Sequence, residues 1–512
     1  MKQKIVLSEK LRKIIAREKL KEKKIVLCHG VFDLLHIGHI KHFEEAKALG
    51  DILVVSLTPD RYVNKGPFRP AFNEKLRLEA VASLGVVDFV CLNTTPTAIG
   101  AIQRIKPNIY CKGPDYKDPK NDVSGQIKNE TNAVKKIGGK TVYTSDITFS
   151  SSKLINKYGD IYSNLQKSLI NRIKKKYSFT KIRELIESFK KLKVLVVGEI
   201  IIDQYVFCEA LGKSGKEPVL VLRDLRKEEY LGGAAAISRH LSQFCDKNGL
   251  LSMVGEKKEF LSKILQNLPK KVDFRYIKKK NSPTILKKRF LDSSDRGSTA
   301  NNKVLGVYTI NDDTLVKKDE KIFNKMLKNT LSKYDLVIVS DYGHGLISKK
   351  SANLICKYSK YLALNAQVNA ANIGYHSMRK YKNIDCVIIN EKEIRHEMRN
   401  KNGKIETLIK KLSLDQNVNN LVVTRGTSGA ILYNKKDKKF NLCAAYAKNS
   451  VDKIGAGDAM LSIIALCLKS GFDRDLALLT ASLAAAQSVE TIGNKESVNK
   501  TKILKTLENI LK

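Results

Sequence analysis

The sequence contains no tryptophan, only 10 prolines in 512 residues, and no long uninterrupted apolar run. The longest clean apolar stretch, residues 459–468, is too short to cross a bilayer, which takes about 20 residues. Residues 1–22 are basic and amphipathic but lack the apolar core of a signal peptide, so we expect an N-terminal helix there. The nine cysteines are odd in number and form no C-x-x-C pair, which excludes a disulfide framework. We therefore expect a cytoplasmic protein with no membrane partner.

Acidic residues are too few to balance the basic ones. The 52 Asp and Glu stand against 93 Lys and Arg, which gives a formal net charge of +41. Such a charge can indicate a nucleic-acid partner, but most of these basic residues are lysines, whereas phosphate and base recognition favours arginine. The interleaved aromatic and basic residues of single-strand binders are also absent. We interpret the charge as a lysine-rich solvated surface, and an RNA-binding protein on a recycled fold is the alternative from another class.

With 43% hydrophobic residues the chain can bury sizeable cores. Short apolar runs that end in glycine turns alternate with helical periodicity, which predicts an α/β fold class with parallel sheets. We expect an amphipathic helix at 1–22, a Rossmann-like domain at 23–157, a helical linker at 158–190, and a second α/β domain at 191–512. The predicted strands lie at residues 24–30, 51–56, 86–91, 108–111 and 141–143 in the first domain, and at 193–198, 336–339, 386–389 and 421–424 in the second, with 218–223 in a small β lid.

Four of the eight histidines fall within fourteen residues, at positions 29, 36, 39 and 42, from the end of the first predicted strand onward. His36 and His39 are separated by Ile and Gly at the predicted start of a helix. Both imidazoles can face a phosphate there, where backbone N–H groups and the helix dipole favour an anion. Gly38 allows the phosphate to approach closely. The motif therefore predicts a site that binds phosphate groups and stabilises their negative charge.

The H-x-G-H string resembles the signature of the cytidylyltransferase-like nucleotidyltransferases, and the likeness extends over about residues 23–157. Matching stretches follow at 65–70 and 112–116. The resemblance implies that a phosphate oxygen attacks the α-phosphorus of a nucleoside triphosphate, ATP or CTP, and that pyrophosphate leaves. It implies catalytic roles for His36 and His39, a substrate contact from Asp115, and nucleotide or phosphate contacts from His29, Gly30, Phe32, Lys65, Arg77, Lys112, Ser150, Ser151 and Ser152.

Two other interpretations of the histidine motif stay open. Two histidines three residues apart can bind a metal ion, but no Asp, Glu or Cys completes a ligand set nearby in the sequence. The H-x-G-H string also matches the first signature of class I aminoacyl-tRNA synthetases. That interpretation requires a K-M-S-K-S-like loop later in the chain, and the segment at Ser150 lacks its first lysine.

A second motif lies near the C-terminus, where residues 455–458 read Gly-Ala-Gly-Asp before an apolar helix. Converging backbone N–H groups at such a turn form an anion hole for a phosphoryl group in transfer. A carboxylate at the end of the turn, here Asp458, stands where a base must accept the proton of a substrate hydroxyl. A simple helix cap would explain one glycine and one aspartate, but not the whole set.

This string resembles the G-A-G-D signature of ribokinase-like (phosphofructokinase-B) sugar kinases, with supporting motifs in family order over about residues 193–495. The resemblance implies a ribokinase-like domain with a small β lid, the use of ATP and Mg²⁺, and Asp458 as the catalytic base. Three departures leave the sugar and the degree of activity open: Ala236, Asn365 and Lys453 replace family residues. The implied phosphate or nucleotide contacts are Asn390 and Glu393, which also support Mg²⁺ indirectly, with Thr424, Gly426, Gly455, Ala456 and Gly457; the implied substrate contacts are Asp203, Gly232, Gly233 and Asp341.

The two halves together resemble, in reversed order, the bifunctional heptose-7-phosphate kinase/heptose-1-phosphate adenylyltransferases. This implies a bifunctional transferase of carbohydrate metabolism that phosphorylates a heptose-like sugar or sugar phosphate and transfers a nucleotidyl group to a sugar 1-phosphate. Sugar phosphates and nucleoside triphosphates are the expected partners, and the chain is expected to form a homodimer. The alternative within enzymes is an active nucleotidyltransferase whose kinase-like domain is catalytically weak or only binds sugar.

Overall fold

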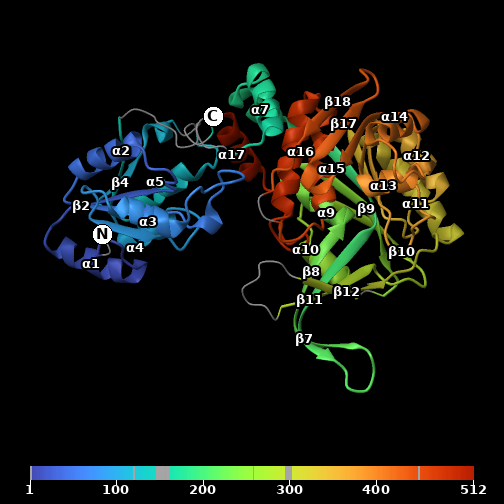
Figure 1. The fold of residues 1–512 in the computed structure, drawn as a ribbon, viewed down its shortest axis with the longest axis horizontal. Helices are drawn as coiled ribbons and strands as arrows, with labels where there is room; N and C mark the ends of the chain where they lie inside the picture. The colour runs from blue at the N-terminus through green and yellow to red at the C-terminus, as the bar shows by residue number, and fades with distance from the viewer. Residues whose placement is uncertain are drawn as a thin grey trace. The chain divides into compact units, whose positions relative to one another are not determined.

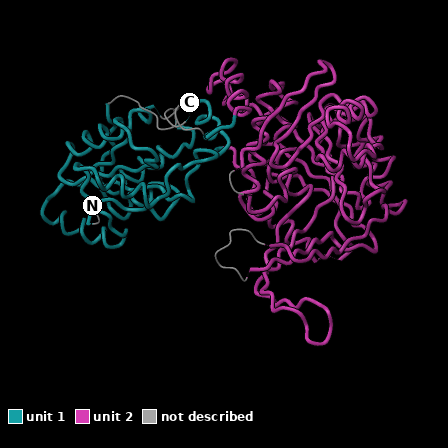
Figure 2. Tube along the Cα trace, viewed as in Figure 1, with its two compact units in different colours: residues 1–163, 501–512 teal, residues 164–500 magenta. Residues whose placement is uncertain are grey.

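The computed structural model describes residues 3–118, 122–145, 156, 161–257, 259–293, 302–447 and 450–512. The chain forms two compact units (Figure 2). Unit 1 comprises residues 1–163 and 501–512, and unit 2 comprises residues 164–500. Most of the segment expected as a linker therefore groups with the second unit, and the last residues of the chain group with the first.

Unit 1 is built on a five-stranded parallel sheet with the strand order β3-β2-β1-β4-β5. The central strands are continuous apolar runs because helices cover both faces of the sheet. One apolar cluster packs α1, α4 and α5 on the sheet, and another packs α2 and α3. The elements are β1 (Ile25–Gly30), β2 (Ile52–Leu57), β3 (Phe89–Leu92), β4 (Ile109–Lys112) and β5 (Lys140–Tyr143), with α1 (Ser8–Leu20), α2 (Ile37–Ala48), α3 (Glu74–Ala82), α4 (Ile99–Ile105) and α5 (Gln126–Lys136).

The C-terminal helix α17 (Lys500–Leu511) completes unit 1, apart from its first residue. Its apolar side chains recur at the spacing of one helix face, and Ile503, Leu507 and Ile510 are buried.

Unit 2 contains a nine-stranded sheet with the order β10-β9-β6-β13-β14-β15-β16-β17-β18. The strands from β10 to β16 in this order run parallel, and β17 and β18 join them as antiparallel strands at one edge. The strands are β6 (Lys193–Gly198), β9 (Lys247–Gly255), β10 (Val272–Lys279), β13 (Leu336–Asp341), β14 (Leu362–Ala366), β15 (Ile384–Asn390), β16 (Val418–Thr424), β17 (Ala430–Asn434) and β18 (Lys439–Cys443).

Helices flank this sheet, and two of them form much of the core. Helices α15 and α16 are apolar around most of their circumference, which is typical of helices buried inside a domain. The helices of unit 2 are α7 (Asn164–Lys176), α8 (Phe179–Glu187), α9 (Ala234–Leu241), α10 (Leu261–Asn267), α11 (Lys317–Thr330), α12 (Lys349–Tyr358), α13 (Glu391–Glu397), α14 (Ile405–Asp415), α15 (Ala456–Lys469) and α16 (Arg474–Ser488).

The expected β lid is a separate four-stranded sheet with the order β12-β11-β7-β8. The far end of the β7–β8 hairpin extends away from the rest of unit 2 (Figure 1). The sequence indicated only part of this lid, because just one of its strands has a clear alternating pattern. Its strands are β7 (Ile200–Lys213), β8 (Leu220–Gly233), β11 (Leu286–Asp292) and β12 (Asn302–Thr309).

The predicted α/β class, with a parallel sheet in the first domain and a small β lid in the second, is confirmed. None of the described helices combines the length and the apolar composition that crossing a bilayer requires.

Two candidate active sites

The first candidate site lies where β1 leads into α2. His36 immediately precedes α2 in an extended conformation, and His39 lies in its first turn. The two imidazole rings stack with their centroids 3.9 Å apart and their planes 20° apart. The structure therefore brings together the two histidines that the sequence motif predicts to act on one phosphate group.

Burial keeps both imidazoles neutral in the absence of a ligand. It lowers the pKa of His39 to about 3, with smaller contributions from the neighbouring His36 and Lys65. Burial and the charge of Lys65 lower the pKa of His36 in the same direction. A bound polyphosphate supplies negative charge, which favours protonated imidazole. The site is therefore electrostatically matched to an anion.

Gly30 and Phe32 position this pair. A Cβ on Gly30 would lie 2.9 Å from Cζ of the Phe32 ring, so the close approach of that ring requires glycine. The ring of Phe32 meets His39 edge-on at 5.4 Å, and the side chain is buried. These contacts favour a packing role for both residues next to the histidine pair.

Lys65 is placed by a loop that Asp33 anchors. The buried Asp33 carboxylate accepts hydrogen bonds from the backbone N–H groups of Ala71 and Phe72, at 2.7 and 3.1 Å, and it pairs with Arg69 at 3.3 Å. Burial lowers the pKa of Lys65 to about 8, Asp33 raises it, and Arg69 lowers it further. Our sequence analysis did not select Asp33 or Arg69, although both stand inside the matching motifs.

The guanidinium of Arg77 is fully engaged by protein acceptors. It donates to the carbonyl oxygens of Phe72, Val31 and Thr58 and to the carboxylate of Asp60, and its side chain has no exposed surface. These bonds tie the loops around the site to α3. They favour a positioning role for Arg77 over the direct phosphate contact that the resemblance implies.

Lys112 lies at the carboxyl end of β4, where its ammonium pairs with Glu130 at 3.3 Å and lies 4.3 Å from the centroid of the Tyr116 ring. Burial lowers the pKa of Lys112, but Tyr110 and Glu130 outweigh it, so that the pKa is raised. His29 is held between the hydroxyls of Ser56 and Thr58.

Asp115 is exposed in the short turn that follows β4. The predicted phosphate contacts Ser150, Ser151 and Ser152 lie outside the described residues.

Within the described part of the chain, one group of residues has potential metal-ligand atoms close together: Cys28, His42 and Cys111. Cys28 and Cys111 face each other on β1 and β4, so this group is brought together by the pairing of the strands. Both thiols belong to the apolar core, and burial raises the pKa of Cys28. His42 hydrogen-bonds Thr144. These features indicate thiols that pack in the core.

The second candidate site lies in unit 2, at the start of α15. Gly455 caps this helix with φ = 87°, a conformation that disfavours other residues, and a Cβ there would collide with the side chain of Asn494. Ala456 and Gly457 form the first turn, so their backbone N–H groups lie at the positive end of the helix. This turn has the geometry of the predicted anion hole.

Asp458 lies in the same turn, and the hydroxyl of Tyr342 donates a hydrogen bond to its Oδ1 at 2.8 Å. Burial raises the pKa of Asp458 to about 7, the Tyr342 bond lowers it, Asp203 raises it and Lys287 lowers it. A base works best when its pKa lies near the working pH. Asp458 therefore has the electrostatics of a general base at neutral pH.

The β lid places Asp203 beside this carboxylate, on β7. Arg289 of β11 donates a hydrogen bond to Asp203 Oδ1 at 2.6 Å, and a Cβ on Gly232 would collide with the Asp203 carboxylate. Gly233 has φ = 59° at the start of α9, where a Cβ would lie 2.5 Å from the carbonyl oxygen of Glu199. The two glycines therefore allow the lid and α9 to pack closely around Asp203.

Two cations of β11 were missed by the sequence analysis. Arg289 pairs with Asp203, and Lys287 lies 5.6 Å from the centroid of the Tyr342 ring. Burial lowers the pKa of Lys287, while Asp203 raises it. The signal in the sequence was the basic run Lys287-Lys288-Arg289, in which Lys287 and Arg289 fall on one face of a strand. It was not used because no strand was predicted there.

Asn390 and Glu393 form a reciprocal capping box at the start of α13. The Asn390 side chain accepts from the backbone N–H of Glu393, and the Glu393 carboxylate accepts from that of Asn390, both at 2.9 Å. Burial raises the pKa of Glu393 to about 7. Thr424 ends β16, and Gly426 follows with φ = 56°. These contacts fit indirect support of a phosphate network.

Asp341 is fully engaged inside unit 2. Lys380 and Tyr381 contact its Oδ2 at 2.6 and 2.7 Å, and the backbone N–H of Gly343 donates to its Oδ1. These partners favour a structural role in shaping the loop after β13 over the substrate contact that the resemblance implies.

The three departures from the kinase pattern fall in different settings. Ala236 is buried in α9, Asn365 donates a hydrogen bond to the carbonyl oxygen of Ile388, and Lys453 is exposed.

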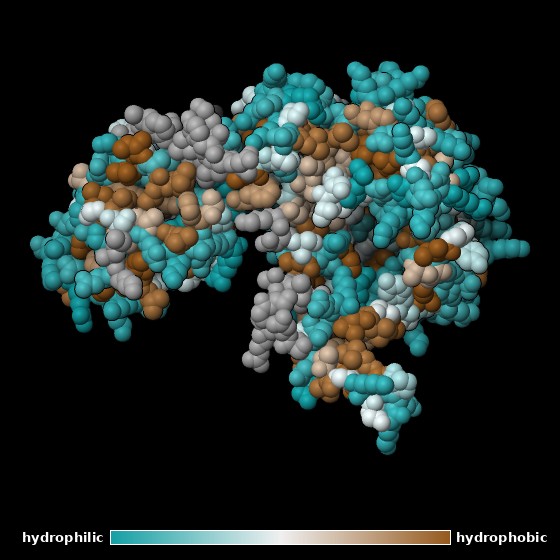
Figure 3. All heavy atoms as spheres, viewed as in Figure 1, coloured by the Kyte–Doolittle hydropathy of each residue, from teal (hydrophilic) through white to brown (hydrophobic). Residues whose placement is uncertain are grey.

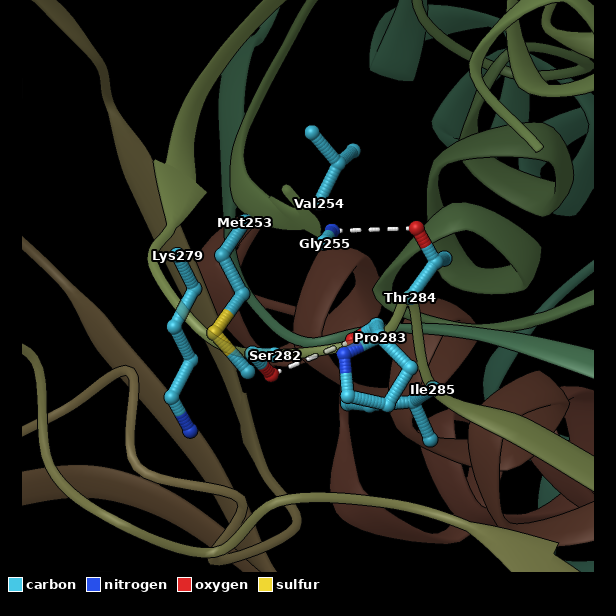
Figure 4. A pocket seen from close by; sticks show the side chains of 8 residues that line it. All are labelled: Met253, Val254, Gly255, Lys279, Ser282, Pro283, Thr284 and Ile285. Atoms are coloured by element: carbon cyan, nitrogen blue, oxygen red, sulfur yellow. Dashed lines mark hydrogen bonds between the residues drawn. The ribbon is translucent and has the colours of Figure 1, made fainter. Parts of the chain in front are cut away.

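A small surface pocket elsewhere in unit 2 leaves no space for a water molecule (Figure 4). No predicted site residue lines it; the lining residues are Met253, Val254, Gly255, Lys279, Ser282, Pro283, Thr284 and Ile285.

Comparisons with known families agree with this two-site architecture. The pfkB family carbohydrate kinase model matches residues 191–501, and the cytidylyltransferase-like model matches residues 27–185. The chain therefore belongs to the pfkB carbohydrate kinase family and carries a cytidylyltransferase-like domain in front of the kinase domain. The histidine motif lies inside the cytidylyltransferase-like match, so that match supports neither the metal-pair interpretation nor the aminoacyl-tRNA synthetase interpretation.

Among curated relatives, the chain is similar to bifunctional protein HldE of Campylobacter jejuni subsp. jejuni serotype O:6, with 26% identity over 312 residues, 60% of this chain and 63% of the relative. It is also similar to bifunctional protein HldE of Helicobacter acinonychis, with 40% identity over 135 residues, 25% of this chain and 29% of the relative. The predicted resemblance to this bifunctional family is confirmed, with the nucleotidyltransferase domain first. The chain spans less than two thirds of the length of these relatives.

Solved structures similar to this chain include a ribokinase from Thermotoga maritima, at 18% identity and a TM-score of 0.46, which covers 62% of this chain and 99% of that one. Phosphofructokinase-2 from Escherichia coli matches at 14% identity and a TM-score of 0.48, with the same coverage.

Proposed function

We propose that this chain is a bifunctional transferase that makes a nucleotide-activated sugar. The kinase unit would phosphorylate the anomeric hydroxyl of a sugar phosphate, heptose-like, with ATP and Mg²⁺. The cytidylyltransferase-like unit would transfer a nucleotidyl group from ATP or CTP to a sugar 1-phosphate and release pyrophosphate. The observation that carries the proposal is the presence of both sites in one chain. Asp458, whose pKa is about 7, lies at the start of α15, and the stacked pair of His36 and His39 lies at the start of α2.

In the kinase unit, Asp458 would accept the proton of the sugar hydroxyl as its oxygen attacks the γ-phosphorus of ATP. The bond from that phosphorus to the β-phosphate oxygen breaks, and ADP leaves. The backbone N–H groups at Ala456 and Gly457 would stabilise the charge on the phosphoryl oxygens. Mg²⁺ would neutralise charge on the ATP phosphates, and Asn390 and Glu393, already bonded to backbone groups, fit an indirect role in holding that network.

The charged residues of the β lid favour a substrate that already carries a phosphate group. Lys287 and Arg289 bring two positive charges next to Asp203, whose carboxylate suits sugar hydroxyls. A guanidinium is well suited to bind a phosphate group through paired hydrogen bonds. These two cations favour a sugar phosphate over a neutral sugar in the kinase unit.

In the first unit, a phosphate oxygen of the sugar 1-phosphate would attack the α-phosphorus of the nucleotide, and the bond to pyrophosphate breaks. His36 and His39 would donate hydrogen bonds to the phosphate oxygens on which charge develops, while Lys65 and Lys112 would add positive charge. No proton has to leave the attacking phosphate, so this step needs no general base.

The proposal predicts sugar-dependent pyrophosphate release. The full chain, incubated with Mg²⁺ and ATP or CTP against a panel of sugar 1-phosphates, is expected to release pyrophosphate with at least one sugar, a heptose 1-phosphate first. Release that needs an amino acid and tRNA instead would contradict the proposal. Retention on RNA that depends on its sequence after salt has screened nonspecific binding would favour the RNA-binding alternative.

Phosphorylation is expected to depend on pH through Asp458. The pKa of this carboxylate is about 7, and the base acts only when it is deprotonated, so kcat/KM should rise as pH increases through 7 and then level off. The hydrogen bond from Tyr342 lowers that pKa, so Tyr342→Phe should move the rise to higher pH. An ADP-release assay from about pH 5.5 to 9 checks this. A flat profile, or an unmoved one in Tyr342→Phe, would argue against Asp458 as the base.

The expected homodimer stays a proposal, supported by the surface of the β lid. Apolar side chains gather there in Figure 3, and exposed apolar patches mark interaction sites on many proteins. The exposed lid residues include Leu220, Leu225, Leu305, Val307 and Tyr308. A cytoplasmic location is likewise proposed, since all nine cysteines are free thiols, as in a reducing compartment.

A further inference from the structure

The C-terminal helix α17 is the starting point, because it lies outside both matched families. The cytidylyltransferase-like match ends at residue 185 and the kinase match at residue 501, so nearly all of α17 follows them. In space, residues 501–512 nevertheless group with unit 1 (Figure 2). Unit 1 is therefore assembled from the two ends of the chain.

Helix α17 packs on the loop that carries Lys65. Gly66 has φ = 100°, and a Cβ on it would lie 2.9 Å from Cγ2 of Thr506, so the helix and the loop are in close contact. One turn further along, the carbonyl oxygen of Asn509 accepts a hydrogen bond from the side chain of Asn156 at 2.6 Å. The buried face of α17 adds apolar contacts. The helix is thus an integral part of the wall of the first site.

This packing places Lys505 among the cations of the site. Its Nζ lies 3.5 Å from Oδ1 of Asn64, the neighbour of Lys65. Burial lowers the pKa of Lys505, Asp122, Glu508 and Glu130 raise it, and Lys112 lowers it. Lys505 therefore interacts with both ends of the predicted phosphate site, the Lys65 loop and the end of β4.

The gathered positive charge needs a partner. The charges of Lys505 and Lys512 both lower the pKa of Lys65, against the opposite effect of Asp33, so each of them disfavours the protonated form of Lys65. Like charges that are held together and partly desolvated destabilise a fold unless an anion joins them. A phosphate group supplies that anion, and it is the group that the neighbouring histidine pair is built to meet.

We propose that α17 completes the nucleotidyl-transfer site and that Lys505 binds a phosphate group of its substrates. This inference rests on the proposed function of unit 1 and adds a residue that neither family match includes. The phosphate belongs either to the nucleoside triphosphate or to the sugar 1-phosphate, and the two sources are separated by kinetics.

The test replaces Lys505 with Met in the full chain. We expect kcat/KM for sugar-dependent pyrophosphate release to fall about 10- to 100-fold, the usual effect of losing a hydrogen bond to a charged group, with Lys505→Arg much closer to wild type. A higher KM for the nucleotide would assign the contact to the triphosphate, and a higher KM for the sugar 1-phosphate would assign it to that substrate. ADP release by the kinase unit should not change, which shows that unit 2 is folded, and near-wild-type pyrophosphate release by Lys505→Arg shows that unit 1 tolerates substitution at this position.

The matched control is Lys135→Met, which removes the same charge from an exposed position on α5. A Lys505→Met variant that keeps pyrophosphate release within twofold of this control would overturn the inference. A second measurement separates the failure of this inference from the failure of the proposed function of unit 1. Calorimetry measures the binding of inorganic pyrophosphate, and His39→Ala serves as the reference for loss of the site. Weaker binding by Lys505→Met supports the inference even if no sugar is found to react, whereas equal binding contradicts it.

Discussion

Replacing Asp458 with Asn is expected to lower kcat/KM for sugar phosphorylation by about 10²- to 10⁴-fold, the usual contribution of a general base. Asparagine keeps the size of the side chain and can still bond to Tyr342, but it cannot accept the substrate proton. The turn at Gly455 and the rest of the anion hole remain in place, so binding of ATP should be retained. ADP release with a sugar phosphate measures the loss.

The control is Asp246→Asn, an exposed aspartate in the same unit, which should phosphorylate as the wild type does. Unchanged phosphorylation by Asp458→Asn would refute the base assignment. No phosphorylation by the wild type with any sugar or sugar phosphate would favour the alternative in which the kinase-like unit only binds sugar.

Replacing His39 with Ala is expected to lower kcat/KM for pyrophosphate release by about 10²- to 10³-fold, as for the removal of one donor to a developing oxyanion. The neutral imidazole of His39 stacks on His36 and is held by Phe32, so its loss removes a donor that is already oriented. The imidazole pKa, about 3 without ligand, should rise when a polyphosphate binds, and NMR titration of His39 can follow this shift.

Lys41→Ala, at an exposed position two residues further along α2, controls for the loss of a side chain from this helix. Equal pyrophosphate release by His39→Ala and Lys41→Ala would remove His39 from the mechanism. An imidazole pKa that stays near 3 with nucleotide bound would show that the phosphates lie elsewhere.

Local sequence was enough to predict the elements around both motifs. The short buried run of β1 leads into His36, and the glycine turn with Asp458 begins the apolar helix α15, so both sets of elements were predictable. The stacking of His36 on His39 follows from their spacing at the start of a helix.

Residues that meet only through tertiary contacts were beyond prediction. Lys287 and Arg289 reach the kinase site because β11 pairs with β7, more than 80 residues earlier in the chain. Nothing local distinguishes Lys505 from the other lysines on the surface, since its importance depends on where α17 packs. The sequence also suggested phosphate or substrate contacts for Arg77 and Asp341, because it does not reveal that protein partners already satisfy both side chains.

The central claim, two independent transferase sites in one chain, is tested most directly by measuring both products from the same preparations. Wild type, His39→Ala and Asp458→Asn are each given ATP, CTP, Mg²⁺, a heptose 7-phosphate and a heptose 1-phosphate, and ADP and pyrophosphate are quantified. The account predicts that His39→Ala loses pyrophosphate and keeps ADP, while Asp458→Asn loses ADP and keeps pyrophosphate. The account would be contradicted if either variant lost both ADP and pyrophosphate, or if both variants kept both products.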